Sequence, residues 1–168
     1  MKMGMMKALI AWCALLAIPG QNILAAPARV SANPVDENVV KIYAYKLLPL
    51  VSMEEAMPGF LVELAKEIVH HPEFPVLVEV SPVPVLMKYS LIQAVGVAAI
   101  GMDKDFSARD LQDLVSIILY EKDGKVYKLY FNTLNPMSSL LQKSTVENLG
   151  RIKTDGTFEK LLTKYKLQ

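Results

Sequence analysis

The hydrophobic pattern in the middle of the chain alternates between strand-like runs and helical stripes. A run rich in β-branched and aromatic residues predicts a strand at 39–47, and a second strand is expected at 75–80. The small-residue run 95–101 predicts a third strand, buried on both faces. Apolar side chains recur at helical spacing through 60–68, and a second helix is expected at 86–94 after a proline-rich turn. This strand-helix-strand-helix-strand order predicts an α/β fold with a mostly parallel sheet flanked by helices.

A β-hairpin is expected after this unit. The apolar runs 114–120 and 125–131 flank Asp123-Gly124, a pair that favours a tight turn between antiparallel strands.

Two helices joined by a tight corner are predicted to follow the hairpin. Asn135 suits the N-cap and Pro136 the first helical residue. Gly156 suits the left-handed position at which this helix stops, and Thr157 is expected to cap the next helix. The last helix has one apolar face, expected to pack on the domain and formed by Phe158, Leu161, Leu162 and Tyr165.

Residues 1–28 have the three-part organisation of a secretory signal peptide. Two lysines precede the apolar stretch 8–18, and small residues follow, with cleavage expected after Ala28 or, as the alternative, after Ala25. The other interpretation is a buried core helix. Residues 29–38 are polar and predict a flexible lead-in. We therefore expect export to the periplasm of a diderm bacterium, with full secretion left open.

Composition narrows the class of protein further. A chain of 168 residues can form one domain with a core of its own. Cleavage after Ala28 removes two lysines and no acidic residue, which changes the formal net charge from +1 to −1. Such a charge gives no electrostatic reason to bind nucleic acid. The single cysteine lies in the signal segment, so the mature chain would contain no disulfide.

No group of residues predicts an enzyme, a metal site or a cofactor. His70 and His71 are the two histidines, and neighbouring positions on a helix point in directions too different for joint chelation. Glu54 and Glu55 could act as an acid and base pair, but a proline-flanked loop favours simple exposure.

Three segments resemble one known family. "IKTDGTFEKLLTKY" (152–165) resembles the terminal signature of bacterial extracellular solute-binding proteins of family 3, the amino-acid-type periplasmic binding proteins of type II. Residues 41–68 are similar to the first strand, loop and helix of that family, with Gly59-Phe60 at its Gly-Phe and Glu63 at its usual Asp. Residues 126–141 are similar to the strand and helix by which the chain returns to lobe 1.

The chain also departs from the family pattern. Ala94 and Val97 stand where the third strand of the family has Gly and Asp, and the carboxylate-binding Thr/Ser-x-x-Arg has no clear match. Only 102–124 lies where lobe 2 would be inserted, and that is too short for a lobe with its own core. The resemblance therefore implies lobe 1 alone, with 39–168 as a single domain and 102–124 as a remnant.

The resemblance implies a periplasmic protein related to the amino-acid-binding components of ABC transporters, with weak or lost ligand binding. In open α/β sheets, ligands sit beyond the carboxyl ends of the strands. The candidate ligand-binding residues there are Tyr45, Pro49, Met102, Asp103 and, as a carboxylate partner, Arg109. Tyr45 could instead pack under the long loop.

The expected partners are a small polar solute such as an amino acid, and either a membrane transporter or a second copy. A homodimer would form through the apolar wall of 47–51 and Met102, unless 102–124 folds over that wall. The alternative function is a periplasmic interaction or scaffold module that is built on the same lobe and has no role in transport.

Overall fold

The computed structural model describes residues 39–71 and 73–167. The predicted signal peptide (1–28) and lead-in (29–38) lie outside these residues.

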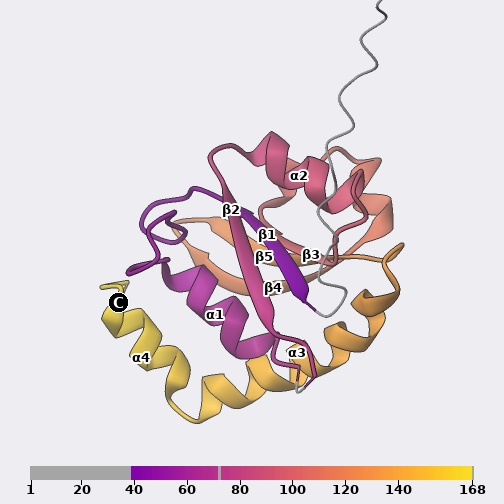
Figure 1. Cartoon of the computed structure of the whole chain (residues 1–168). Helices are drawn as coiled ribbons and strands as arrows, with labels where there is room; N and C mark the ends of the chain where they lie inside the picture. Colours follow the sequence, from indigo (N-terminus) through magenta and orange to yellow (C-terminus); the bar gives the residue numbers. More distant parts are fainter. Residues whose placement is uncertain (1–38, 72, 168) are drawn as a thin grey trace, which may run out of the picture. The chain divides into compact units, whose positions relative to one another are not determined.

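The elements follow the order that the sequence predicts (Figure 1). The strands are β1 (Val40–Tyr45), β2 (Val76–Ser81), β3 (Ala98–Gly101), β4 (Leu114–Lys122) and β5 (Lys125–Asn132). The helices are α1 (Phe60–Ile68), α2 (Pro84–Ile92), α3 (Pro136–Thr154) and α4 (Thr157–Lys164), with short 3₁₀ turns at Asp103–Asp105 and Asp110–Asp113.

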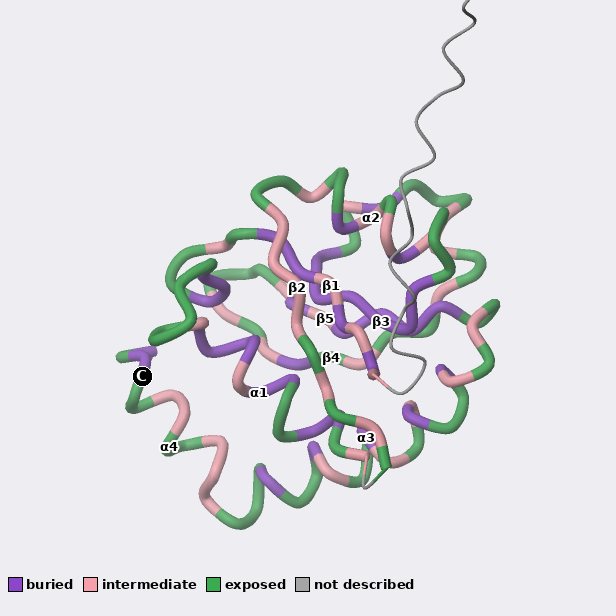
Figure 2. The backbone as a smooth tube through the Cα atoms, viewed as in Figure 1, coloured by how far each residue is buried: buried purple, intermediate pink, exposed green. Residues whose placement is uncertain are grey.

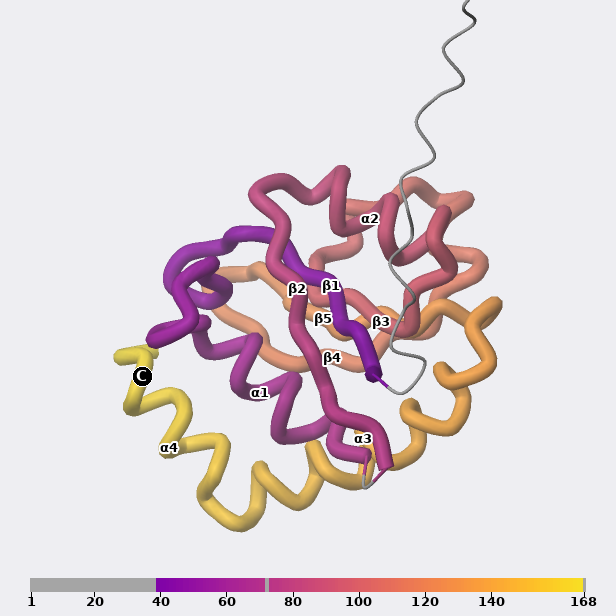
Figure 3. The backbone as a smooth tube through the Cα atoms, viewed as in Figure 1, coloured from indigo at the N-terminus to yellow at the C-terminus, as the bar shows by residue number. Residues whose placement is uncertain are grey.

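The sheet has five strands in the order β2-β1-β3-β5-β4. β1 pairs in parallel with β2 and β3, whereas β5 pairs antiparallel with β3 and β4. The α/β class with flanking helices is therefore confirmed, but the sheet is mixed and the expectation of a mostly parallel sheet is not. The reason is the predicted hairpin: the chain turns at Asp123 (φ 51°) and Gly124 (φ 69°) and sends β5 back between β3 and β4 (Figure 3).

The helices cover the two faces of this sheet unequally. Among the described helices, α2 is the one that packs on one face, against β1, β2 and β3. α1, α3 and α4 contact one another on the other face (Figure 1). The core runs through the central strands and α1 (Figure 2). Its largest fully buried side chains include Ile42, Phe60, Leu64, Met87, Ile100, Leu129, Tyr130 and Phe131.

Some element boundaries differ from the sequence expectation. α2 begins at Pro84 rather than at 86, because proline is tolerated in the first turn of a helix. The first strand ends at Tyr45, after which Leu47 makes an isolated antiparallel bridge with Val51. This loop meets α1 at Gly59, whose φ is 100° and where a Cβ atom would lie 2.5 Å from the carbonyl oxygen of Leu50. Only glycine fits there.

The C-terminal helix pair has the expected corner with one change in its capping. The Asn135 side chain accepts a hydrogen bond from the N–H of Met137, which confirms it as an N-cap. Gly156 is left-handed (φ 82°), as predicted. The capping role given to Thr157 is wrong: its backbone N–H donates instead to Oδ1 of Asp155, 2.9 Å away. The buried side of α3 includes Leu141, Thr145, Leu149 and Ile152.

α4 is docked on α1 through polar and aromatic contacts. The Glu63 carboxylate accepts hydrogen bonds from Nζ of Lys164 (2.6 and 2.9 Å) and from the Tyr165 hydroxyl (2.8 Å). The Phe158 ring meets Phe60 edge to face at 5.6 Å, but it is only half-buried. The segments 41–68 and 152–165 are thus in direct contact.

Candidate functional site

The carboxyl ends of β1 and β3 meet at a buried tyrosine and a tight turn. β1 ends at Tyr45, and β3 is followed directly by Met102 and the first 3₁₀ turn. The turn places Oδ2 of Asp105 where it accepts hydrogen bonds from the N–H of Met102 (2.8 Å) and from the Tyr45 hydroxyl (2.9 Å). The strand ends are therefore closed by a side chain of the same chain.

A second carboxylate lies beside the first. The pairing of β3 with β5 sets Tyr130 opposite Ala99 and Lys128 opposite Gly101. From these positions, Nζ of Lys128 (2.6 and 2.8 Å) and the Tyr130 hydroxyl (2.6 Å) both donate to Asp103. We call Tyr45, Asp103, Asp105, Lys128 and Tyr130 the carboxylate cluster.

Hydrogen bonding and burial shift the pKa values of three groups in this cluster, Asp103, Tyr45 and Tyr130. The hydrogen bonds from Lys128, and then from Tyr130, lower the pKa of Asp103 below its ordinary value. Burial, and then the hydrogen bonds to Asp105 and Asp103, raise the pKa of Tyr45 and of Tyr130. At neutral pH both hydroxyls are therefore protonated donors, and the Asp103 carboxylate that accepts from Tyr130 is ionised.

The structure brings together three of the five predicted ligand-binding residues. Tyr45 and Asp103 belong to the cluster, and Met102 contributes its backbone N–H while its side chain is buried. Pro49 is exposed and lines a separate cavity of about 330 Å³ near the hairpin turn. Arg109 is exposed, and within the described part of the chain its guanidinium has no hydrogen-bonding or ion-pair partner.

The apolar wall expected beside this site is small. Leu50, Val51 and Met102 are buried, which leaves Leu48 and Pro49 exposed. Within the segment 102–124, residues 114–122 form the edge strand β4, and Lys122 and Asp123 line the same cavity as Leu48 and Pro49 of the wall.

Three residues of the cluster were missed by sequence reasoning. Asp105 lies in a polar segment that gave no structural signal, and its partner Tyr45 is 60 positions away. Lys128 and Tyr130 occupy alternate positions of a predicted strand, so the alternation could have placed them on one face. Their position beside β3 depends on the order of the strands in the sheet, and the hydrophobic pattern of a single strand does not predict that order.

A larger cavity lies elsewhere on the molecule. Its volume is about 460 Å³, and it is lined by the loop 52–58, by Val62 and Lys66 of α1, and by Leu77, Val78 and Val80 of β2. It shares no residue with the carboxylate cluster.

Comparison with known proteins leaves the family open. No family model matches the chain, and no curated protein shows significant similarity to it. Within residues 39–71 and 73–167, no helix is long and apolar enough to cross a membrane. The same residues contain no group of three or more His, Cys, Asp or Glu side chains placed to hold a metal ion.

Proposed function

We propose that this chain is an exported, solute-binding-like protein related to the amino-acid-binding components of ABC transporters, reduced to one lobe, in which ligand binding is weak or lost. Export would proceed through the signal peptide 1–28 to a periplasm. The family resemblance of the tail and of the segment around Gly59-Phe60 supports this proposal, and so does the contact of Glu63 with Lys164 and Tyr165 that joins those segments.

One observation supports the proposal that ligand binding is weak or lost. The hydroxyls of Tyr45 and Tyr130 and the ammonium of Lys128 already donate to carboxylates of the chain itself. A free amino acid brings a carboxylate that needs such donors, so it would have to displace Asp103 or Asp105. With a single lobe, one side of the ligand also stays in water. We expect binding of roughly millimolar strength, about −4 kcal/mol, or none.

Titration calorimetry with a panel of free amino acids tests this proposal, with sedimentation of the same samples. The variant Asp105→Ala frees the Tyr45 hydroxyl and the Met102 N–H, and should strengthen amino-acid binding roughly tenfold. Asp110→Ala is the matched control, because Asp110 lies in the same segment but bonds to Ser107 and Lys88. Micromolar binding by the unaltered, monomeric chain would refute the proposal.

A second candidate function is an interaction or scaffold module, and helix α2 favours it. This helix exposes apolar side chains at Val85 (62%), Leu86 (48%) and Tyr89 (63%). Adjacent exposed apolar groups of this kind often mark a contact with another protein, such as a membrane transporter or a second copy. A scaffold should ignore amino acids, which separates the two candidates in the same titrations.

A further inference from the structure

Among the described residues, no strand pairs with the outer edge of β2. β2 ends the sheet beside β1, and in Figure 1 it is drawn in front of the other strands. The N–H of Val40 donates to the carbonyl of Pro75, and the N–H of Lys46 donates to the carbonyl of Ser81, each at 2.9 Å. In a parallel pair, alternate residues of a strand bond to a given neighbour. The backbone groups of the odd-numbered residues of β2 therefore bond to β1. The backbone groups of the even-numbered residues point away from β1.

The outward-facing residues are Val76, Val78 and Val80. Their N–H and C=O groups have no hydrogen-bond partner among the described residues. Such a row of backbone donors and acceptors is a template for an added strand.

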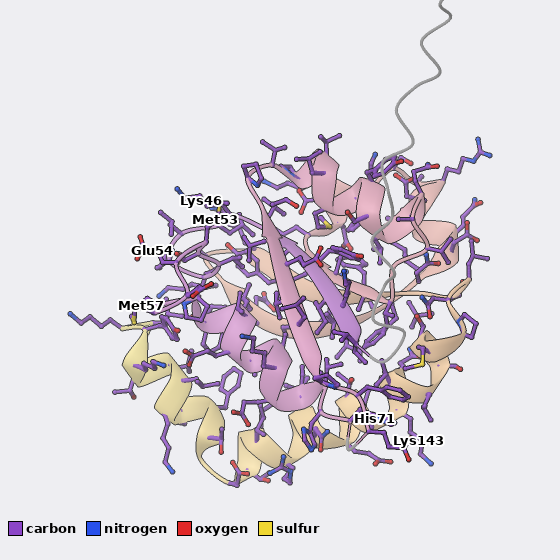
Figure 4. All side chains as sticks on the ribbon, viewed as in Figure 1. Lys46, Met53, Glu54, Met57, His71 and Lys143 are labelled. Carbon is purple, nitrogen blue, oxygen red and sulfur yellow. The ribbon has the colours of Figure 1, made fainter. Side chains whose placement is uncertain are left out.

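The cavity of about 460 Å³ lies along this same edge. Val78 and Val80 line it from β2, Val62 and Lys66 line it from α1, and residues of the loop 52–58 complete the lining. A strand added to β2 would direct alternate side chains toward the α1 face and hence into this cavity. Met53, an exposed and adaptable side chain, lies on the loop that forms the rim, near Glu54 and Met57 (Figure 4).

The rim of the cavity has a charge pattern that favours one kind of occupant. Glu54 and Glu55 line the cavity from the loop, and neither carboxylate has an ion-pair partner within the described residues. Lys66 on α1 is the one basic residue among those lining it. The loop side therefore suits a basic side chain. A second copy pairing through its own β2 could not supply one, because Glu79 is the only charged residue of that strand.

We propose that the β2 edge and this cavity bind an extended peptide segment of a partner protein as an added strand. An apolar side chain of the segment fills the cavity, and a Lys or Arg two positions away, on the same face of the strand, faces Glu54 and Glu55. The cavity shares no residue with the carboxylate cluster, so peptide binding stands apart from the proposed loss of amino-acid binding, and either can fail without the other.

Fluorescence polarisation with two labelled hexapeptides, TVTKTV and TVTETV, tests this proposal on the full chain, because the valines and the charged residue then lie on one face of the added strand. The lysine peptide should bind roughly tenfold more tightly than the glutamate peptide, because of the acidic rim. The double variant Glu54→Gln with Glu55→Gln should remove that preference. Both side chains are exposed, so this variant keeps the fold. Equal binding of the two peptides, or no saturable binding of either, would overturn the proposal.

Proline substitution locates the bound strand. Val78→Pro removes an outward N–H that the native sheet does not use, and should weaken binding of the lysine peptide roughly tenfold. Ser116→Pro is the matched control on the other edge of the sheet. There the Thr133 N–H donates to the Asp113 carbonyl (2.9 Å), so the odd-numbered residues at the start of β4 bond to β5. The backbone N–H of Ser116 therefore points away from the sheet, like that of Val78. Its peptide affinity should stay unchanged.

The variants also separate the other occupants. A loss of binding in Ser116→Pro would move the site to β4 and overturn the proposal. A homodimer in sedimentation that Val78→Pro dissociates would show that a second copy, rather than a partner peptide, occupies the edge. A change of stability in Val78→Pro is measured by urea unfolding. If that variant unfolds, the Glu54 and Glu55 double variant decides the outcome.

Discussion

Removing the Glu63 carboxylate should weaken the docking of the last helix. This carboxylate accepts hydrogen bonds from Lys164 and from the Tyr165 hydroxyl, which come from 101 and 102 positions further along the chain. The Glu63 side chain is 22% exposed and that of Lys164 is 47% exposed. Glu63→Ala breaks both contacts at once.

The magnitude follows from these exposures. A partly exposed ion pair contributes about 0.5 kcal/mol. A hydrogen bond to a charged acceptor contributes about 1.5 kcal/mol. Glu63→Ala should therefore lower the free energy of unfolding by about 2 kcal/mol, Tyr165→Phe by about 1.5 kcal/mol, and Lys164→Ala by about 0.5 kcal/mol.

Urea unfolding at neutral pH, followed by circular dichroism, measures all three variants. Glu67→Ala is the control, because Glu67 is an exposed carboxylate on the same helix, and its removal should change stability by less than about 0.5 kcal/mol. A double-mutant cycle between Glu63 and Tyr165 should give a coupling of at least about 1 kcal/mol. The reasoning fails if Lys164→Ala is the most damaging change, or if all three variants match the control.

Two further predictions concern buried polar groups. The Thr145 hydroxyl is buried and has no hydrogen-bond partner among the described residues, so Thr145→Val should raise stability by about 1 kcal/mol in the same urea assay; a loss of stability would point to an unseen partner. Burial and the hydrogen bond to Glu63 raise the pKa of Tyr165 from 10.0 to about 12. The unfolded chain ionises at the lower value, so this contribution is complete below about pH 10 and is lost as the pH rises through about 12. Urea midpoints should fall across that window, less steeply in Tyr165→Phe, and a flat profile would contradict this.

Local chemistry accounts for what the sequence predicted well. Asp123-Gly124, Asn135 and Gly156 fix turns and helix ends through their own backbone preferences, and these were confirmed. The helical stripe of α1 was confirmed for the same reason, since its period belongs to a single element.

Non-local pairing accounts for what the sequence could not predict. The insertion of β5 between β3 and β4 is a property of the whole sheet, and it alone brings Lys128 and Tyr130 beside Asp103. Arg109 was chosen for its chemistry, but it lies before the second 3₁₀ turn with its side chain in solvent. The choice of arginine as a carboxylate partner therefore did not identify Lys128 and Tyr130, the residues that donate to a carboxylate in the structure.

The contact between α4 and α1 has a consequence for how the molecule is made. The first helix is synthesised about a hundred residues before Lys164 and Tyr165, the partners of its Glu63. Strand β1 is likewise synthesised long before β5, the strand that pairs with β3 on the side away from β1. Native contacts of such long sequence separation slow folding, because loop closure must precede them. Until residues 157–167 arrive, the apolar side of α1 lacks part of its cover and is available to chaperones, to proteases and to other nascent chains. Loss of residues 157–167 would therefore lower the yield of folded protein.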